Sequence, residues 1–186
     1  MMRIITGKAR GTRLDTLPGD NTRPTAERAK EAVFSMLQFE LQGRCVLDLF
    51  AGSGQMALEA ISRGAESAVL VDVSREAVGV ITRNVQKCRM EAQCRVLCSD
   101  YAAFCRSVRG EAFDLIFLDP PYAARLVCPS LRSLAAAGAI ADGALIVCES
   151  EEADVLEADA ALREHYEVLR CTRYGVAHVT VLRYRG

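Results

Sequence analysis

The feature of this chain that most constrains its fold is a regular alternation of apolar runs and helical patterns from residue 44 onward. Short runs such as VLDLF and VLVDV are rich in branched residues, as buried strands are. Between them, apolar residues recur every three to four positions, which is typical of helices. The expected strands span 45–50, 67–73, 94–100, 113–119 and 144–150, and the expected helices span 54–64, 74–88, 101–109 and 129–138.

This alternation predicts an α/β fold: a Rossmann-like, doubly wound sheet that is mostly parallel. Continuous apolar strands agree with burial on both faces of such a sheet. Two further strand-like runs, 166–175 and 176–185, predict an antiparallel β-hairpin at the C-terminus. We expect one domain over 1–186, composed of an arm and loop at 1–24, a helix at 25–41 with Thr25 as its N-cap, and a core at 44–186.

Charge is distributed unevenly along a chain whose formal net charge is only −1. The first thirteen residues carry four basic side chains and no acid, whereas 149–159 is strongly acidic. A basic arm on a near-neutral protein is compatible with a polyanionic partner such as RNA. It is equally compatible with a solvated tail that binds nothing.

The eight cysteines do not have the paired spacing of a zinc site, so we expect reduced thiols and no metal. The N-terminus has no secretory signal pattern, and no apolar run is long enough to cross a membrane. These observations predict a cytoplasmic protein with no membrane partner.

A glycine loop follows the first expected strand of the core. Gly52, Ser53 and Gly54 stand between that strand and a helix, where the backbone can turn tightly and approach a ligand. The run fits G-x-G-x-x-A, and Asp72 lies twenty residues after Gly52. This is also the dinucleotide pattern, so a nicotinamide oxidoreductase is one alternative.

Four consecutive expected strands carry an acid at or near their carboxyl ends: Asp48, Asp72, Asp100 and Asp119. Asp48 precedes the glycine loop, where a carboxylate repels a pyrophosphate but suits a cationic ligand such as S-adenosylmethionine. Asp72 can accept from the ribose hydroxyls and Asp100 from the adenine amino group, although Asp100 is also a good N-cap. The predicted cofactor-binding residues are Asp48, Phe50, Ala51, Gly52, Ser53, Gly54, Asp72, Val73, Ser99, Asp100 and Asp119.

The fourth expected strand ends in Asp-Pro-Pro-Tyr, which cannot continue a sheet ladder because proline has no N–H to donate. Methylating the amino group of a base requires acceptors for its two N–H groups. The side chain of Asp119 is one acceptor, and the carbonyl of Pro120 is the other. Pro121 restricts the turn, and Tyr122 offers a face on which the base can stack. We therefore expect Asp119, Pro120, Pro121 and Tyr122 to form the catalytic elbow.

These motifs together resemble the class I S-adenosylmethionine-dependent methyltransferases that act on amino groups. With the stretches RIITGKARGTRL and TRPTAERAKEAVFSML, the chain resembles the bacterial 16S ribosomal RNA (guanine(966)-N(2))-methyltransferase family of the RsmD type. The resemblance implies transfer of a methyl group to a guanine N2 of 16S rRNA in the 30S subunit or an assembly intermediate, by a monomer. The residues that it places on RNA are Arg3, Lys8, Arg10, Arg13, Arg23, Thr25, Arg28 and Tyr122.

Two alternatives to guanine methylation stay open besides the oxidoreductase. The elbow fits methylation of adenine N6 in DNA or RNA equally well. A catalytically silent RNA-binding subunit is the other alternative, which the complete set of acids disfavours.

Overall fold

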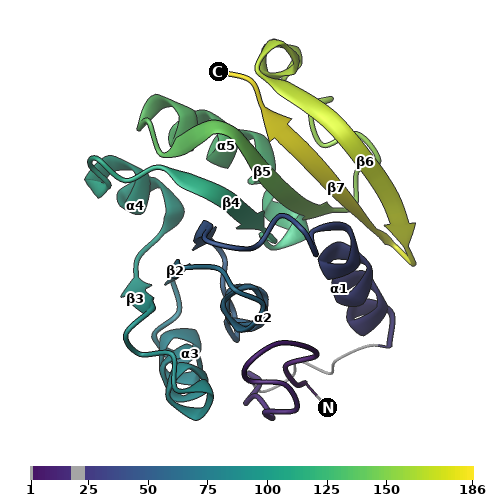
Figure 1. Cartoon of the computed structure of the whole chain (residues 1–186). Helices are drawn as coiled ribbons and strands as arrows, with labels where there is room; N and C mark the ends of the chain where they lie inside the picture. Colours follow the sequence, from purple (N-terminus) through teal and green to yellow (C-terminus); the bar gives the residue numbers. More distant parts are fainter. Residues whose placement is uncertain (1, 18–23) are drawn as a thin grey trace.

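The structure is a computed structural model that describes residues 2–17 and 24–186, with the backbone alone for 24–26. It contains one seven-stranded sheet in the order β3-β2-β1-β4-β5-β7-β6 (Figure 1). The strands are β1 (Cys45–Asp48), β2 (Ser67–Asp72), β3 (Cys94–Cys98), β4 (Phe113–Leu118), β5 (Ile140–Ser150), β6 (Tyr166–Tyr174) and β7 (Ala177–Tyr184). The predicted Rossmann-like architecture is thus confirmed.

The first five strands are parallel, and β7 and β6 add the predicted antiparallel hairpin. Strand order reverses at β1, which pairs with β2 on one side and with β4 on the other. In such sheets ligands bind where the order reverses, outside the carboxyl ends of the strands. The fold therefore directs attention to the residues that follow β1 and β4.

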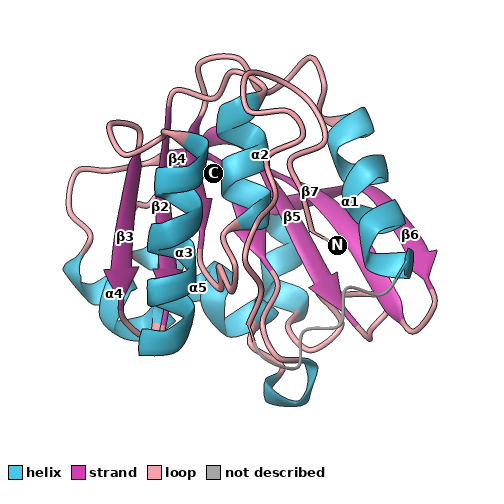
Figure 2. Ribbon diagram, turned by 90° about the horizontal axis from the view of Figure 1, so that it is seen from below, coloured by secondary structure: helices cyan, strands magenta, loops and turns pink. Residues whose placement is uncertain are grey.

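Helices cover both faces of the sheet (Figure 2). One face is covered by α1 (Pro24–Met36), α2 (Gln55–Ser62) and α3 (Arg75–Cys88). The opposite face is covered by α4 (Tyr101–Ser107) and α5 (Val127–Ala136). Short 3₁₀ helices, η1 (Tyr122–Ala124) and η2 (Ala160–Glu164), lie in connections. Each face buries its own apolar cluster: Phe117 packs into one, and Ile116 and Leu118 pack into the other. Alternate side chains of β4 therefore pack into opposite apolar clusters, which fixes the position of this strand in the sheet.

Two N-terminal expectations are corrected. The helix begins at Pro24 and not at Thr25, so Thr25 lies inside it; proline is favoured at the first helical position because its φ is already helical. That helix ends at Met36, five residues before the expected Leu41. Within the arm, Arg3 and Arg13 form a single antiparallel bridge.

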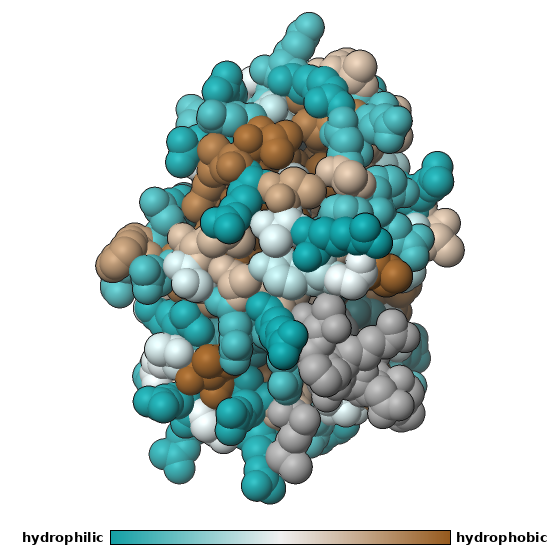
Figure 3. Space-filling view, turned by 90° about the vertical axis from the view of Figure 1, so that its right-hand side faces the viewer, coloured by the Kyte–Doolittle hydropathy of each residue, from teal (hydrophilic) through white to brown (hydrophobic). Residues whose placement is uncertain are grey.

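The sheet ends at β6, an edge strand whose pairing with β7 shifts between Val168 and Arg170. Val168 and Leu169 are exposed there, and Figure 3 shows apolar surface on this side of the molecule among polar side chains. A bulge and neighbouring arginines are common protections of an open sheet edge.

Candidate active site

The glycine loop connects β1 to α2 in a conformation that two glycines make possible. Gly52 and Gly54 have φ of 54° and 77°, in the left-handed region that side chains disfavour. A Cβ at Gly54 would lie 2.9 Å from Cδ2 of Leu70 on β2, so this glycine also permits close packing of the loop on the sheet. A Cβ at Gly52 would meet nothing within 4 Å, because Gly52 faces open space.

Asp48 ends β1 and lies beneath this loop, 3% exposed. The Ala57 N–H of α2 donates to its Oδ2 at 3.4 Å. Burial raises the pKa of Asp48 to about 7, against the effect of that hydrogen bond and with a further contribution from the charge of Asp72. The carboxyl group is thus poised to ionise when a cation comes close.

Asp72 and Asp100 each hold part of the backbone with their carboxylates. Asp72 accepts from the Gly52 N–H at 2.9 Å through Oδ2 and from the Ser74 N–H at 2.8 Å through Oδ1. Asp100 is the N-cap of α4, where its Oδ1 accepts from the Ala102 and Ala103 N–H groups. Asp72 therefore shapes the loop, and the N-cap interpretation of Asp100 is confirmed; a role toward an adenine stays a prediction.

The elbow after β4 has the expected order. Asp119 directly follows the strand and is exposed, Pro120 is buried, and Tyr122 is half-buried at the start of η1. The Tyr122 hydroxyl donates to Oε1 of Glu149 at 2.5 Å. Burial raises the pKa of Tyr122, and so does its bond to Glu149, so the phenol stays protonated and can donate at neutral pH.

One cavity of about 630 Å³ brings the ends of these strands together. Besides Pro120 and Pro121, eight residues that were predicted to bind cofactor or substrate line this cavity: Phe50, Gly52, Asp72, Val73, Ser99, Asp100, Asp119 and Tyr122. The side chain of Val73 is 71% exposed. The predicted residues Asp48, Ala51, Ser53 and Gly54 do not line this cavity and lie buried behind it.

Several functional candidates were not predicted. Leu17, Leu49, Tyr101 and Leu126 complete the lining, and the Phe50 and Tyr101 rings lie 6.0 Å apart at their centroids. Glu149 lies near the end of β5, where the rule that found the other strand-end acids would have found it as well. No comparable pattern in the sequence indicates Leu17, which reaches the cavity from the arm.

The basic arm is anchored on α2 by one buried carboxylate. Glu59 is 0% exposed and accepts from the Ile5 and Thr6 N–H groups at 2.7 and 3.0 Å. It also pairs with Lys30 at 3.3 Å and with Arg63 at 2.7 Å. Gly7 allows the backbone of the arm to lie close to the end of α2, because a Cβ at this position would lie 1.8 Å from the carbonyl oxygen of Ser62. The interpretation of the arm as a solvated tail is therefore wrong.

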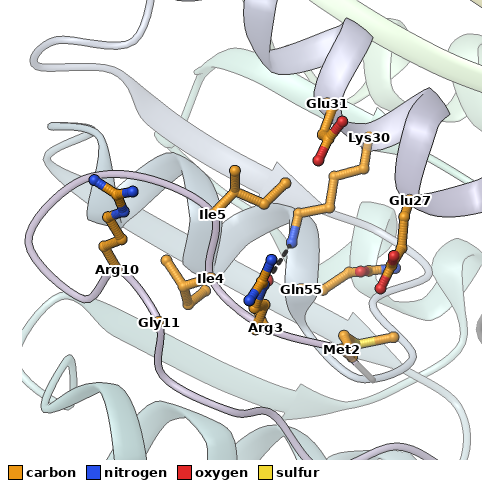
Figure 4. A pocket seen from close by; sticks show the side chains of 10 residues that line it. All are labelled: Met2, Arg3, Ile4, Ile5, Arg10, Gly11, Glu27, Lys30, Glu31 and Gln55. Carbon is orange, nitrogen blue, oxygen red and sulfur yellow. Dashed lines mark hydrogen bonds between the residues drawn. The ribbon is translucent and has the colours of Figure 1, made fainter.

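The anchored arm forms a second cavity, of about 240 Å³, against the start of α1 and α2. Lys30 extends from α1 into this cavity and donates to the Arg3 carbonyl at 3.2 Å (Figure 4). Arg10 lies on the opposite side of the cavity from α1. Glu27 and Glu31 contribute carboxylates from α1, and Gln55 lines the cavity beside the glycine loop.

The residues predicted to bind RNA lie in different surroundings. Arg3, Lys8, Arg10 and Arg13 are exposed on the arm, and Lys8 donates to Gln93. Arg28 is exposed on α1. Thr25 lies in α1 with its side chain outside the description, and Arg23 lies outside the described residues.

Neither a metal site nor a membrane span is found in the described part of the chain. Within residues 2–17 and 24–186, no three His, Cys, Asp or Glu side chains are grouped to hold a metal ion. None of the described helices is long and apolar enough to cross a membrane.

The sheet with its reversal at β1, the glycine loop and the Asp-Pro-Pro-Tyr elbow define a class I methyltransferase. The family model described as conserved hypothetical protein 95 matches residues 2–183. The chain belongs to this family.

Relatives and solved structures agree over most of the chain. It is 34% identical over 150 residues to ribosomal RNA small subunit methyltransferase D of Escherichia coli, covering 81% of this chain and 75% of that one. It is 32% identical over 190 residues to YlbH of Bacillus subtilis, covering all of both chains. The structure of Escherichia coli YhhF, described provisionally as a methyltransferase, superposes with a TM-score of 0.85 at 29% identity, over 100% of this chain and 98% of that one.

Proposed function

We propose that this protein transfers the methyl group of S-adenosylmethionine to the exocyclic N2 of a guanine in 16S rRNA, within the small ribosomal subunit or its assembly intermediate. The observation that carries the proposal is the Asp119 elbow, which opens into the same cavity as the ends of β2 and β3. The name of the Escherichia coli relative, a methyltransferase of small-subunit rRNA, supports the choice of substrate.

The residues of the larger cavity fit S-adenosylmethionine. The open face of Gly52 leaves room for the methionine part, and Asp72 beside exposed Val73 suits a ribose and an adenine ring. Asp48, buried below the loop with a raised pKa, offers a negative charge near the sulfonium and amino groups once it ionises. When bound, this cofactor supplies an electrophilic methyl group.

The elbow acts on the base itself. A guanine amino nitrogen is a weak nucleophile because its lone pair is delocalised into the ring. Asp119 and the Pro120 carbonyl would hold its two N–H groups and direct the lone pair toward the methyl group. Transfer would form the N–CH₃ bond as the C–S bond breaks and S-adenosylhomocysteine leaves, and one amino proton would be released through exposed Asp119 to solvent. Tyr122 stacks on the base after it leaves the RNA helix.

The alternative is methylation of adenine N6 with the same elbow. Adenine also carries an amino group with two N–H donors, so Asp119 and Pro120 alone do not distinguish the two bases. The rRNA relatives favour RNA as the substrate over DNA.

Replacing Asp119 by alanine tests the proposed chemistry. We expect Asp119→Ala to reduce kcat by at least about 100-fold, as loss of a preorganised transition-state group does, with S-adenosylmethionine affinity within about threefold. Calorimetry measures the binding and labelled methyl transfer to 30S particles measures turnover. A large loss of cofactor binding would show that Asp119 serves the cofactor and not the base.

A further inference from the structure

The order of the strands determines from which side the target base approaches Asp119. The ends of β2 and β3 lie on one side of β1, and β4 and then β5 lie on the other. In the proposed function the adenosine part occupies the β2 and β3 side, at Asp72 and Ser99. The base must therefore reach the elbow from the side of β5.

Glu149 lies on that side, next to the elbow. In the register of β4 and β5, Leu118 pairs with Cys148, so Asp119 and Glu149 are the next residues along the two neighbouring strands. Glu149 is half-buried, and the hydroxyl of Tyr122 donates to its Oε1 at 2.5 Å. This bond ties the carboxylate to the ring on which the base would stack.

Guanine and adenine differ beside the amino group that is methylated. In guanine the atom next to the amino-bearing carbon is N1, which carries a hydrogen; in adenine the corresponding N1 has a lone pair. A carboxylate accepts hydrogen bonds and donates none when ionised. A carboxylate at this position therefore attracts the N1–H of guanine and repels the N1 lone pair of adenine. Both effects favour guanine over adenine.

We propose that Glu149 is the specificity-determining residue of the site: its carboxylate accepts the guanine N1–H next to the amino group that Asp119 holds. Tyr122 orients this carboxylate through its hydroxyl and the base through its ring. The inference rests on the proposed function, and it names the contact that separates guanine from adenine.

The test uses 30S particles reconstituted with guanine or 2-aminopurine at the target position. 2-Aminopurine keeps the amino group at C2 but has a lone pair at N1. We expect the wild type to prefer guanine by at least about 100-fold in kcat/KM, as sites built around a hydrogen bond do. Glu149→Gln can present its amide NH₂ to the N1 lone pair, so we expect that preference to fall at least about tenfold.

Glu151→Gln is the matched control, since it removes the same charge from an exposed residue two positions along the chain. Its preference should equal that of the wild type, and calorimetry should show that Glu149→Gln binds S-adenosylmethionine normally. An unchanged preference in Glu149→Gln overturns the role of Glu149 and leaves the proposed function standing. A wild type that methylates no guanine-containing particle overturns both.

Discussion

At the scale of single residues, Asp48 shows how the fold changes the chemistry of a side chain. It ends a buried strand, and the loop and α2 close over it, so water cannot solvate its charge. Burial raises its pKa from 3.8 to about 7. In the unfolded chain the same carboxyl group ionises near its ordinary pKa.

This difference predicts a pH dependence of stability. Because the folded pKa is the higher one, the contribution of Asp48 is fully present below about pH 4 and is lost as the pH rises through about 7. We therefore expect the free energy of unfolding of Asp48→Asn, taken relative to that of the wild type, to increase as the pH rises over this range. The increase should be no more than about 4 kcal/mol. Urea denaturation at pH 4.5 to 8 measures it, and a difference that stays constant with pH would contradict it.

The sequence predicted residues whose role follows from their place on a strand or helix. Asp72, Asp100 and Asp119 could be found because acids after parallel strands meet at one edge of the sheet. The expected start of a helix at residue 74 agrees with the structure, where Ser74 is the N-cap of α3 and accepts from the Ala77 N–H at 3.3 Å. The partners of Glu59 could not be found, since they lie 53 and 54 residues away at Thr6 and Ile5 and depend on tertiary packing.

At the scale of elements, the arm and α2 behave as one unit. The arm is held by backbone groups, through Glu59 and through the Lys8 and Ala9 N–H groups at Ser62. Its arginine side chains are thereby left at the surface with a fixed backbone beneath them. The sequence predicted the basic charge of the arm but not its docking, because no periodic pattern marks the contacts.

Reversing the charge of Arg10 and Arg13 tests this element. We expect the double Arg→Glu variant to bind 16S rRNA more weakly and to lower the slope of log affinity against log salt by about 1 to 2, since each phosphate contact releases counterions. Its melting temperature should stay close to that of the wild type, because the anchoring bonds do not use these side chains. Filter binding at several salt concentrations measures the slope.

The matched control is the double Arg→Glu change at Arg106, in the last turn of α4, and Arg109, two residues after that helix ends. Both side chains are exposed, and α4 lies on the opposite face of the sheet. This control makes the same change in net charge and should leave the salt slope nearly unchanged. Equal slopes for both double variants would mean that the arm contributes only net charge and contacts no phosphate.

At the scale of the whole molecule, the sheet order places the two proposed ligands on opposite sides of β1 and β4. In the proposed function the cofactor lies over the ends of β2 and β3, and the base enters from the side of β5. Because the proposed substrate is the small ribosomal subunit or its assembly intermediate, we infer that the folded particle presents the target guanine and that short naked RNA is a poor substrate.

The central claim, methylation of a guanine N2 in 16S rRNA, is tested most directly by mapping the product. Purified protein is incubated with labelled S-adenosylmethionine and with 30S particles that lack the modification, and the labelled nucleotide is then identified by digestion and mass spectrometry. We predict a single N2-methylguanosine in 16S rRNA and little label in an isolated hairpin of the same sequence. Label in N6-methyladenosine, or efficient methylation of the hairpin with none on the particles, would contradict the claim.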